Sequence, residues 1–395
     1  MPRPGLVHLV LALGGFAIGT TEFATMSLLP YLARDLQISV PVAGRLISAY
    51  ALGVVVGAPL IAVLSARLPR KTLLMALMGL YALGNGLSAL APSYHWMIGF
   101  RFLSGLPHGA YFGIAILVAA SVVRTDQRTQ AAGHVLLGLT IATIVGVPLA
   151  NWLGQAVGWR WCFGIVAALA LATAILVAMF SPEGSQDKTA SPIRELGALK
   201  RGQVWLTLAI GAIGFGGVFA VYTYLASTLM AVTGVPARMI PMVFAAFGVG
   251  MTAGNIVVPY FADRAVMRTA GWLLLGSAVT LALYPFAAAH LATVTLDVLA
   301  IGFCGALATV LQTRLMDVAG DAQSLAAALN HSAFNVANAL GPWLGGLAIA
   351  AGLGWTSTGW VGCGLALGGF AAWLVALIAE RSPGAVVARN DQAPT

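Results

Sequence analysis

Long apolar runs alternate with short polar connections along the whole chain. Each run approaches or exceeds the roughly 20 residues that a helix needs to cross the hydrocarbon core of a bilayer. The runs lie near residues 6–30, 42–64, 72–92, 95–120, 130–155, 160–180, 204–231, 238–261, 269–289, 291–313, 323–351 and 355–379. The pattern predicts an all-α membrane protein with twelve transmembrane helices.

A polar stretch near the middle divides these runs into two sets of six. It carries the charged residues Glu183, Asp187, Lys188, Arg194, Glu195, Lys200 and Arg201. We therefore expect an N-terminal six-helix bundle over 1–181, a cytoplasmic linker over 182–203, a C-terminal six-helix bundle over 204–380 and a short cytoplasmic tail over 381–395.

Composition supports a membrane protein. The chain is 59% hydrophobic and 8% charged, whereas soluble domains carry about 25% charged residues. The first apolar run continues from Arg3 past Glu22, too long for the 7–15-residue core of a signal peptide, so we expect an uncleaved first helix. Cys162, Cys304 and Cys363 each stand alone in an apolar run, which favours packing over a disulfide or a metal site.

The basic residues predict the orientation. Cytoplasmic connections of membrane proteins carry an excess of Lys and Arg, and here fifteen of the 20 basic residues fall in connections on the side of the termini. The opposite side holds Arg34, Arg45, Arg160 and Arg238, and Arg101 lies within a run. Both termini are therefore expected in the cytoplasm. This placement explains the net charge of +8 without a nucleic-acid partner.

The two halves repeat one another. Arg67 and Arg264 follow the second run of each half and lie 197 positions apart. Gly146-Val147-Pro148 is echoed by Gly341-Pro342, and Gly158-Trp159 by Gly354-Trp355, at offsets of 194 to 196. Landmarks at nearly one offset indicate duplication. An even number of spans per half makes the repeats parallel, related about the membrane normal.

Four motifs carry a resemblance to a known family. They are Gly19-Thr20-Thr21-Glu22-Phe23, Ala66-Arg67-Leu68-Pro69-Arg70-Lys71, Arg101-Phe102-Leu103-Ser104-Gly105-Leu106-Pro107-His108-Gly109, and Gly146-Val147-Pro148. The chain resembles the major facilitator superfamily, and within it the bacterial twelve-helix drug:proton antiporters of the arabinose- and sugar-efflux-permease branch. The resemblance implies a multi-pass transporter of the bacterial inner membrane. It would be a monomer that binds protons and a small-molecule substrate and transports them by alternating access.

The same resemblance assigns conformational roles to two sets of residues. Arg67, Arg70, Lys71, Asp263 and Arg264 belong to the two copies of the family's loop motif, and Gly146 and Pro148 to a hinge motif. In the first loop Ala62, Ala66 and Pro69 replace the motif's first glycine, its aspartate and its second glycine. The aspartate is implied to latch the outward-open state, so the first copy lacks that latch.

Ionisable residues inside the runs are candidates for proton coupling, because each costs about 2.5–3.5 kcal/mol even on a lenient insertion scale. Glu22 lies deep in the first run. Burial disfavours the charged form of a carboxyl group, so this group is suited to bind and release a proton near neutral pH. Arg101 in the fourth run is expected to face a central cavity and to pair with Glu22 or a backbone carbonyl. The alternative for both residues is a purely structural contact.

Further polar residues are candidates for a substrate cavity. His108 shares a helix face with Arg101. Asp297 lies 196 positions after Arg101, which is almost the equivalent position in the second repeat. His331, Asn335 and Asn338 fall at i, i+4 and i+7 on one helix face, which indicates a cavity or a contact between helices. Tyr222 ends an aromatic stripe with Phe215 and Phe219, for which core packing is the favoured interpretation.

No enzyme or cofactor motif stands out. The chain has no P-loop, HExxH or GxSxG pattern, and its Gly-x-Gly pairs lie inside apolar runs rather than between a strand and a helix. We therefore expect no enzyme activity, no cofactor and no metal. The prediction is proton-coupled efflux of a drug-like or sugar-like molecule. A proton symporter, a uniporter and a non-transporting membrane sensor remain as alternatives.

Overall fold

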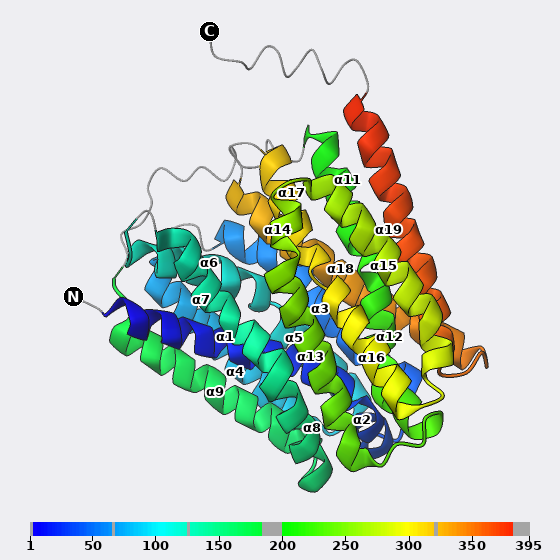
Figure 1. Ribbon diagram of the computed structural model, residues 1–395. Helices are drawn as coiled ribbons and strands as arrows, with labels where there is room; N and C mark the ends of the chain where they lie inside the picture. The colour runs from blue at the N-terminus through cyan, green and yellow to red at the C-terminus, as the bar shows by residue number, and fades with distance from the viewer. Residues whose placement is uncertain (1–2, 65–67, 125–126, 184–199, 320–322, 382–395) are drawn as a thin grey trace.

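The computed structural model describes residues 3–64, 68–124, 127–183, 200–319 and 323–381 (Figure 1). The first half contains α1 (Pro4–Ser27), α2 (Leu29–Asp35), α3 (Val40–Leu64), α4 (Arg70–Ala89), α5 (Tyr94–Gly105), α6 (His108–Ser121), α7 (Arg128–Ile141), the π-helical turn η2 (Ala142–Gly146), α8 (Val147–Ala156) and α9 (Trp159–Phe180). Most of the predicted linker and tail lies outside these residues.

The second half repeats this order. It contains α11 (Gly202–Gly214), α12 (Gly216–Ala231), η4 (Ala237–Met239), α13 (Ile240–Val257), α14 (Pro259–Ala262), α15 (Val266–Ala287), α16 (Leu291–Cys304), α17 (Leu307–Ala319), α18 (Gln323–Ala350) and α19 (Ser357–Arg381). Within the described ranges, 11 helical spans are long and apolar enough to cross a membrane, and α18 lies between the last two of them. The predicted all-α fold with twelve spans is confirmed.

The boundaries differ from expectation at a few points. The first span stops at Ser27, and Pro30 occupies the first turn of the separate short helix α2. The tenth span continues to Ala319, six residues beyond the predicted end. Helix α11 starts at Gly202, inside the predicted linker. Pro30 explains the break before α2, because proline lacks the backbone N–H that a helix interior requires and is therefore favoured in a first turn.

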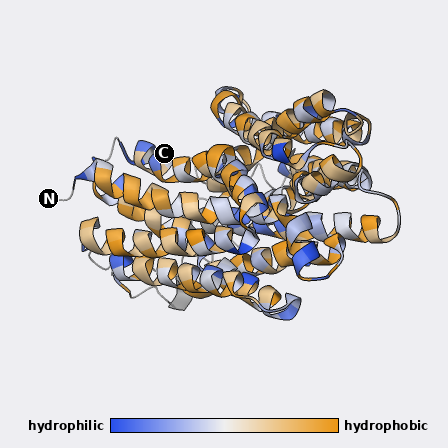
Figure 2. Ribbon diagram, turned by 90° about the horizontal axis from the view of Figure 1, so that it is seen from below, coloured by the Kyte–Doolittle hydropathy of each residue, from blue (hydrophilic) through white to orange (hydrophobic). Residues whose placement is uncertain are grey.

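Hydrophobic residues dominate the helices (Figure 2), and many of their side chains are exposed on the outside of the bundle. Trp272 is 70% exposed, and Leu296 and Phe286 are 68% exposed. Buried polar side chains include Glu22 and Arg101. An apolar exterior around polar interior groups is the arrangement that lipid requires of a helical bundle.

Glycines set the packing of equivalent helix pairs in the two halves. A Cβ atom on Gly53 of α3 would collide with the backbone oxygen of Phe102, and one on Gly105 of α5 with that of Tyr50. In the second half, a Cβ atom on Gly250 of α13 would collide with the backbone oxygen of Leu299, and one on Gly302 of α16 with that of Phe247. All four pairs of equivalent positions are 197 apart, so the duplication extends to close backbone packing.

This register refines the comparison of Asp297 with Arg101. At offset 197 the repeat-equivalent of Arg101 is Val298, and Asp297 corresponds to Phe100. Adjacent residues of a helix point about 100° apart. Asp297 therefore does not lie on the face of α16 that is equivalent to the Arg101 face of α5. Asp297 is therefore a near neighbour of the equivalent position and not its exact counterpart, and its place in a cavity stays a prediction.

The turns that precede the last helix of each half also match. Gly158 has a φ of +103° and Gly354 a φ of +82°, a conformation that glycine adopts without steric cost. Trp159 follows Gly158 and donates its indole N–H to Asp35 Oδ2 at 3.0 Å. Arg160 pairs with the same carboxylate, and this hydrogen bond lowers the pKa of Asp35, which lies outside the spans. These contacts tie α2 to the start of α9.

The two halves meet through α3 with α18 and through η2 and α8 with α13. Ser48 Oγ donates to the carbonyl oxygen of Ala339 at 2.9 Å, and Gln155 Nε2 to that of Ala237 at 2.9 Å. These residues lie in the middle of the spans or toward the end that holds α2. Figure 1 shows the helices of the two halves converging there and spreading apart toward the end that holds the chain termini.

The glycine packing gives a direct test within one helix. Gly105→Ala should lower the thermal stability of the purified protein, since the added Cβ meets the Tyr50 backbone and overpacking costs about 1–3 kcal/mol. Gly99→Ala, also in α5, places its Cβ in open space. It should be neutral or slightly stabilising, because alanine is favoured over glycine in helices by about 1 kcal/mol. Equal unfolding temperatures for the two variants would contradict the packing account.

Candidate proton and substrate site

Glu22 lies at the junction of the two halves. Its side chain, on α1, is 8% exposed, and Asn338 Nδ2 of α18 donates to Glu22 Oε1 at 3.0 Å. The bond joins residues 316 positions apart. A carboxyl group and an amide from opposite halves therefore share one hydrogen bond inside the membrane-spanning region.

Small residues allow other helices to approach α1 closely around this carboxyl group. A Cβ on Gly19 would press on Leu139 and Ala142, and a Cβ on Gly146 would collide with Thr20 Oγ1. Gly146 ends the π-helical turn η2, and Pro148 follows in the first turn of α8. Proline removes a helical hydrogen bond, and π-turns often occur at functional sites. Of the predicted hinge residues, Gly146 thus packs on α1 at Thr20, two residues before Glu22, and Pro148 follows it at the start of α8.

Arg101 is held by aromatic faces. It is 1% exposed, and its guanidinium carbon lies 4.3 Å from the ring centroid of Tyr50 and 5.4 Å from that of Phe163. Its Nη1 is 3.5 Å from Ser104 Oγ. Its charge is close enough to act on Glu22. No salt bridge between these two described side chains forms, so the expected direct pairing is absent from this structure.

A hydrogen-bonded chain continues from the Tyr50 ring. The Tyr50 hydroxyl lies 2.9 Å from His108 Nδ1 and 3.4 Å from the Tyr81 hydroxyl, which donates to the Ile18 carbonyl oxygen at 3.3 Å. Tyr50 and Tyr81 were not singled out from the sequence. Tyrosines in apolar helices are common, and only the packing of α3 and α4 places these two beside Arg101.

The polar face of α18 contacts the first half. The His331 ring stacks on Phe112 with centroids 5.6 Å apart and lies 6.4 Å from the His108 ring. Asn335 Nδ2 donates to the His331 carbonyl oxygen at 2.9 Å. The amide oxygens of Asn335 and Asn338 are buried and have no hydrogen-bond partner among the described residues.

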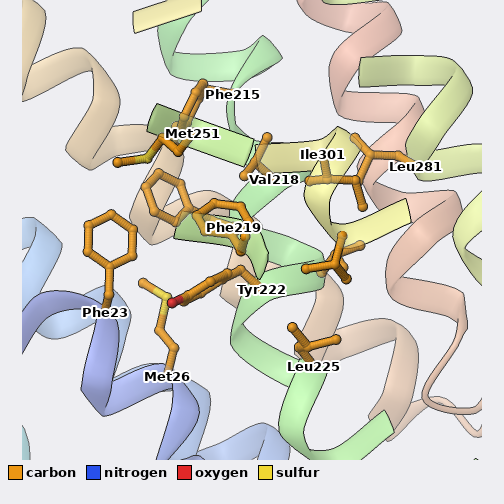
Figure 3. Close-up of a cluster of buried hydrophobic side chains, with 14 of the residues drawn as sticks. Phe23, Met26, Phe215, Val218, Phe219, Tyr222, Leu225, Met251, Leu281 and Ile301 are labelled. Atoms are coloured by element: carbon orange, nitrogen blue, oxygen red, sulfur yellow. The ribbon is translucent and has the colours of Figure 1, made fainter. Parts of the chain in front are cut away.

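The aromatic stripe on α12 is buried in the junction. Phe215, Phe219 and Tyr222 are each less than 10% exposed. The Tyr222 ring lies 5.6 Å from Phe23 of α1 and 4.4 Å from Phe247 of α13. Figure 3 shows its hydroxyl on the side of α1, beside Met26. That hydroxyl lacks a partner in the part of the chain that the structure describes, so Tyr222 combines packing with an unused polar group.

The remaining candidates lie elsewhere. Asp297 is 9% exposed and acts electrostatically on Tyr284 and Cys304, inside the second half. Arg70 and Lys71 start α4, and Asp263 and Arg264 follow α14, all at the end of the bundle that holds the termini. Ala66 and Arg67 lie outside the described residues. Across the described ranges no group of three or more His, Cys, Asp and Glu side chains is placed to hold a metal.

This architecture, two repeated bundles around a buried polar junction, is that of a membrane transporter. The family model described as the Major Facilitator Superfamily matches residues 11–296 and 225–394. The chain belongs to that superfamily, a family of transporters and not of enzymes.

Its similarity to individual proteins spans nearly the whole chain. It is 40% identical over 385 residues to the inner membrane transport protein YdhP of Escherichia coli strain K12, covering 97% of this chain and 98% of YdhP. It is 34% identical to a chloramphenicol resistance protein of Streptomyces lividans over 84% of this chain and 86% of that one. A crystal structure of a variant of the nucleoside transporter NupG superposes with a TM-score of 0.74 at 14% identity, covering 94% and 99% of the two chains.

The aromatic support of Arg101 can be tested at Tyr50. Tyr50→Phe keeps the ring under the guanidinium and loses the hydroxyl contacts, a loss of about 1 kcal/mol. Tyr50→Leu also removes the cation–π contact, which contributes about 2 kcal/mol when desolvated. Thermal unfolding should rank wild type above Tyr50→Phe, and Tyr50→Phe above Tyr50→Leu. If the two variants unfold at one temperature, the ring face does not support Arg101.

Proposed function

We propose that this protein exports a small organic molecule across the bacterial inner membrane in exchange for protons. The observation that carries the proposal is the hydrogen bond between Glu22 of α1 and Asn338 of α18. A charged carboxylate accepts a stronger hydrogen bond than a neutral acid, about 1.5–3 against 0.5–1.5 kcal/mol. Proton binding at Glu22 therefore weakens a contact between the halves, which links proton occupancy to their relative movement.

Arg101 completes this switch. With Glu22 charged, the two buried groups sum to zero charge, and with Glu22 protonated the region carries one uncompensated positive charge. An excess charge in low dielectric is costly, so the protonated state favours a rearrangement that exposes the site to water. Arg101 is anchored by Tyr50 and Phe163 rather than by Glu22. The carboxyl group is thus free to exchange its proton or to meet a substrate.

The groups around Glu22 favour an aromatic substrate with hydroxyl or amide groups. The Tyr222 hydroxyl and the amide oxygens of Asn335 and Asn338 have no partner among the described side chains. Phe23, Phe219 and Phe334 offer aromatic surface at the same junction. Pockets that combine apolar walls with a few polar groups are typical of small-molecule sites. Chloramphenicol appears in the name of one relative. It is an aromatic amide with hydroxyl groups and is therefore the first substrate to test.

Transport would proceed by rocking of the bundles 1–181 and 204–380, within one chain, around this junction. Gly146 and Pro148 would act as the hinge beside α1. Arg67, Arg70, Lys71, Asp263 and Arg264 would form contacts at the cytoplasmic end that change as the halves move. With both termini in the cytoplasm, the convergence of the halves at α2 corresponds to closure on the periplasmic side. His108 and His331 would line the cytoplasmic side of the site.

Glu22→Gln tests the coupling. Glutamine keeps the shape and the acceptor for Asn338 but cannot exchange a proton. In proteoliposomes with an imposed pH gradient, this variant should lose uphill chloramphenicol transport at least tenfold, while substrate binding stays measurable and loses its pH dependence. If the wild-type protein moves chloramphenicol in the same direction as protons, it is a symporter. If the pH gradient has no effect on chloramphenicol transport, it is a uniporter.

Asp297→Asn is the matched control. It removes another buried carboxyl group, on α16 within the second half, that no described hydrogen bond joins to Asn338. This variant should keep gradient-driven transport. Loss of coupling in Asp297→Asn together with normal coupling in Glu22→Gln would move the proton site to α16 and reject the role of Glu22.

The orientation has its own test. Reporter domains that are active only in the cytoplasm, fused after Arg194 and after Arg389, should both be active, because the side of the termini carries the excess of Lys and Arg. A periplasmic signal at either fusion point would contradict the proposed topology.

A further inference from the structure

Two histidines face each other in the first half, apart from the central junction. His8 lies in the second turn of α1 and His134 in the second turn of α7. Their ring centroids are 5.2 Å apart, and the two Nδ1 atoms approach to 3.2 Å. The other ring nitrogen of His8, Nε2, lies 3.2 Å from the carbonyl oxygen of Ala119 on α6. Three helices therefore fix this pair.

The Ala119 contact determines which nitrogen of His8 is free. A carbonyl oxygen can only accept, so Nε2 of a neutral His8 must carry the proton that it donates. Its Nδ1 then presents a lone pair toward His134. Metal-binding histidines are commonly oriented in this way, with the non-ligating N–H donated to a backbone carbonyl.

We propose that His8 and His134 form a binding site for a divalent transition-metal ion held between their two Nδ1 atoms. Zinc–nitrogen bonds measure about 2.0–2.1 Å. Two such bonds across the observed 3.2 Å separation enclose an angle of about 103°, close to the tetrahedral value. Imidazole ligands suit Zn²⁺, Cu²⁺ and Ni²⁺, whereas Mg²⁺ and Ca²⁺ prefer oxygen.

One proton must move when the ion binds. Without metal, His134 Nδ1–H donates to the lone pair of His8 Nδ1. The ion needs a lone pair on both atoms, so His134 shifts its proton from Nδ1 to Nε2 or releases it to water. The hydrogen bond between the rings is replaced by two metal–nitrogen bonds, and no electron is transferred.

Two glycines near the pair leave the adjoining helix surface uncovered by other side chains. Gly5 precedes His8 by one turn and Gly133 precedes His134 by one residue, and a Cβ atom on either glycine would meet nothing within 4 Å. The pair also lies near the end of the bundle where α1 begins. Because no third His, Cys, Asp or Glu joins it among the described residues, water must complete the coordination. That makes the ion exchangeable rather than permanently bound.

The site has a mechanical consequence that is independent of proton coupling. Helix α1 carries Glu22, and α7 leads into η2. An ion on His8 and His134 ties these two helices together inside the first half. Occupancy should therefore raise the thermal stability of the protein without joining the two halves.

The test measures metal binding to the purified full chain, prepared without a polyhistidine tag. Titration with Zn²⁺ against a fluorescent chelator should give one ion per chain and raise the unfolding temperature, and Mg²⁺ should do neither. His8→Gln and His134→Gln should each weaken Zn²⁺ binding at least tenfold. His95→Gln and His290→Gln, at exposed positions away from the pair, should leave it unchanged.

A spectroscopic measurement on the unaltered chain removes dependence on the variants. Electron paramagnetic resonance of bound Cu²⁺ should show coupling to two imidazole nitrogens. The proposal is overturned if the wild type binds no Zn²⁺ at micromolar concentrations, if both glutamine variants bind as the wild type does, or if only one nitrogen couples. None of these results bears on the proton coupling assigned to Glu22.

Discussion

A hydrocarbon environment offers no water to a buried polar group, so each such group in this protein depends on partners within the bundle. That constraint decides where the helices touch. Glu22 finds Asn338 across the two halves, and Arg101 finds the rings of Tyr50 and Phe163. Because the partners come from different helices, the polar junction holds together elements that apolar packing alone would not align, since lipid is as apolar as leucine.

The glycine contacts make this arrangement possible. Gly53 and Gly105 bring α3 and α5 into backbone contact, which places the Tyr50 ring under the Arg101 guanidinium. The second half uses Gly250 and Gly302 in the same register, yet the position equivalent to Arg101 holds Val298. Duplication thus preserved the glycine scaffold but not the buried arginine. The second half supplies amide and hydroxyl groups instead.

In the proposed mechanism, the junction is also the place where the two halves move relative to each other. The amide nitrogen of Asn338 donates to Glu22, whereas the Asn338 amide oxygen and the Tyr222 hydroxyl have no hydrogen-bond partner among the described residues. Such groups are costly to leave unsatisfied, at about 1–3 kcal/mol each. In the proposed function, a bound substrate that satisfies these groups would stabilise one arrangement of the halves over another. A carrier requires that preference, because a ligand shifts an equilibrium only by its differential affinity for the two states.

The sequence by itself determined the spans, the repeat and the short list of intramembrane charges, because hydropathy and duplication are local or periodic properties of the chain. Glu22, Arg101 and Asn338 stand out as polar residues in apolar runs. Only the tertiary structure decided their partners. It joined Glu22 to Asn338 over 316 positions, placed the Arg101 guanidinium against aromatic rings, and set Asp297 one residue of register from the position equivalent to Arg101. The relative rotation of two helices depends on packing contacts distant in sequence, which no run of residues records.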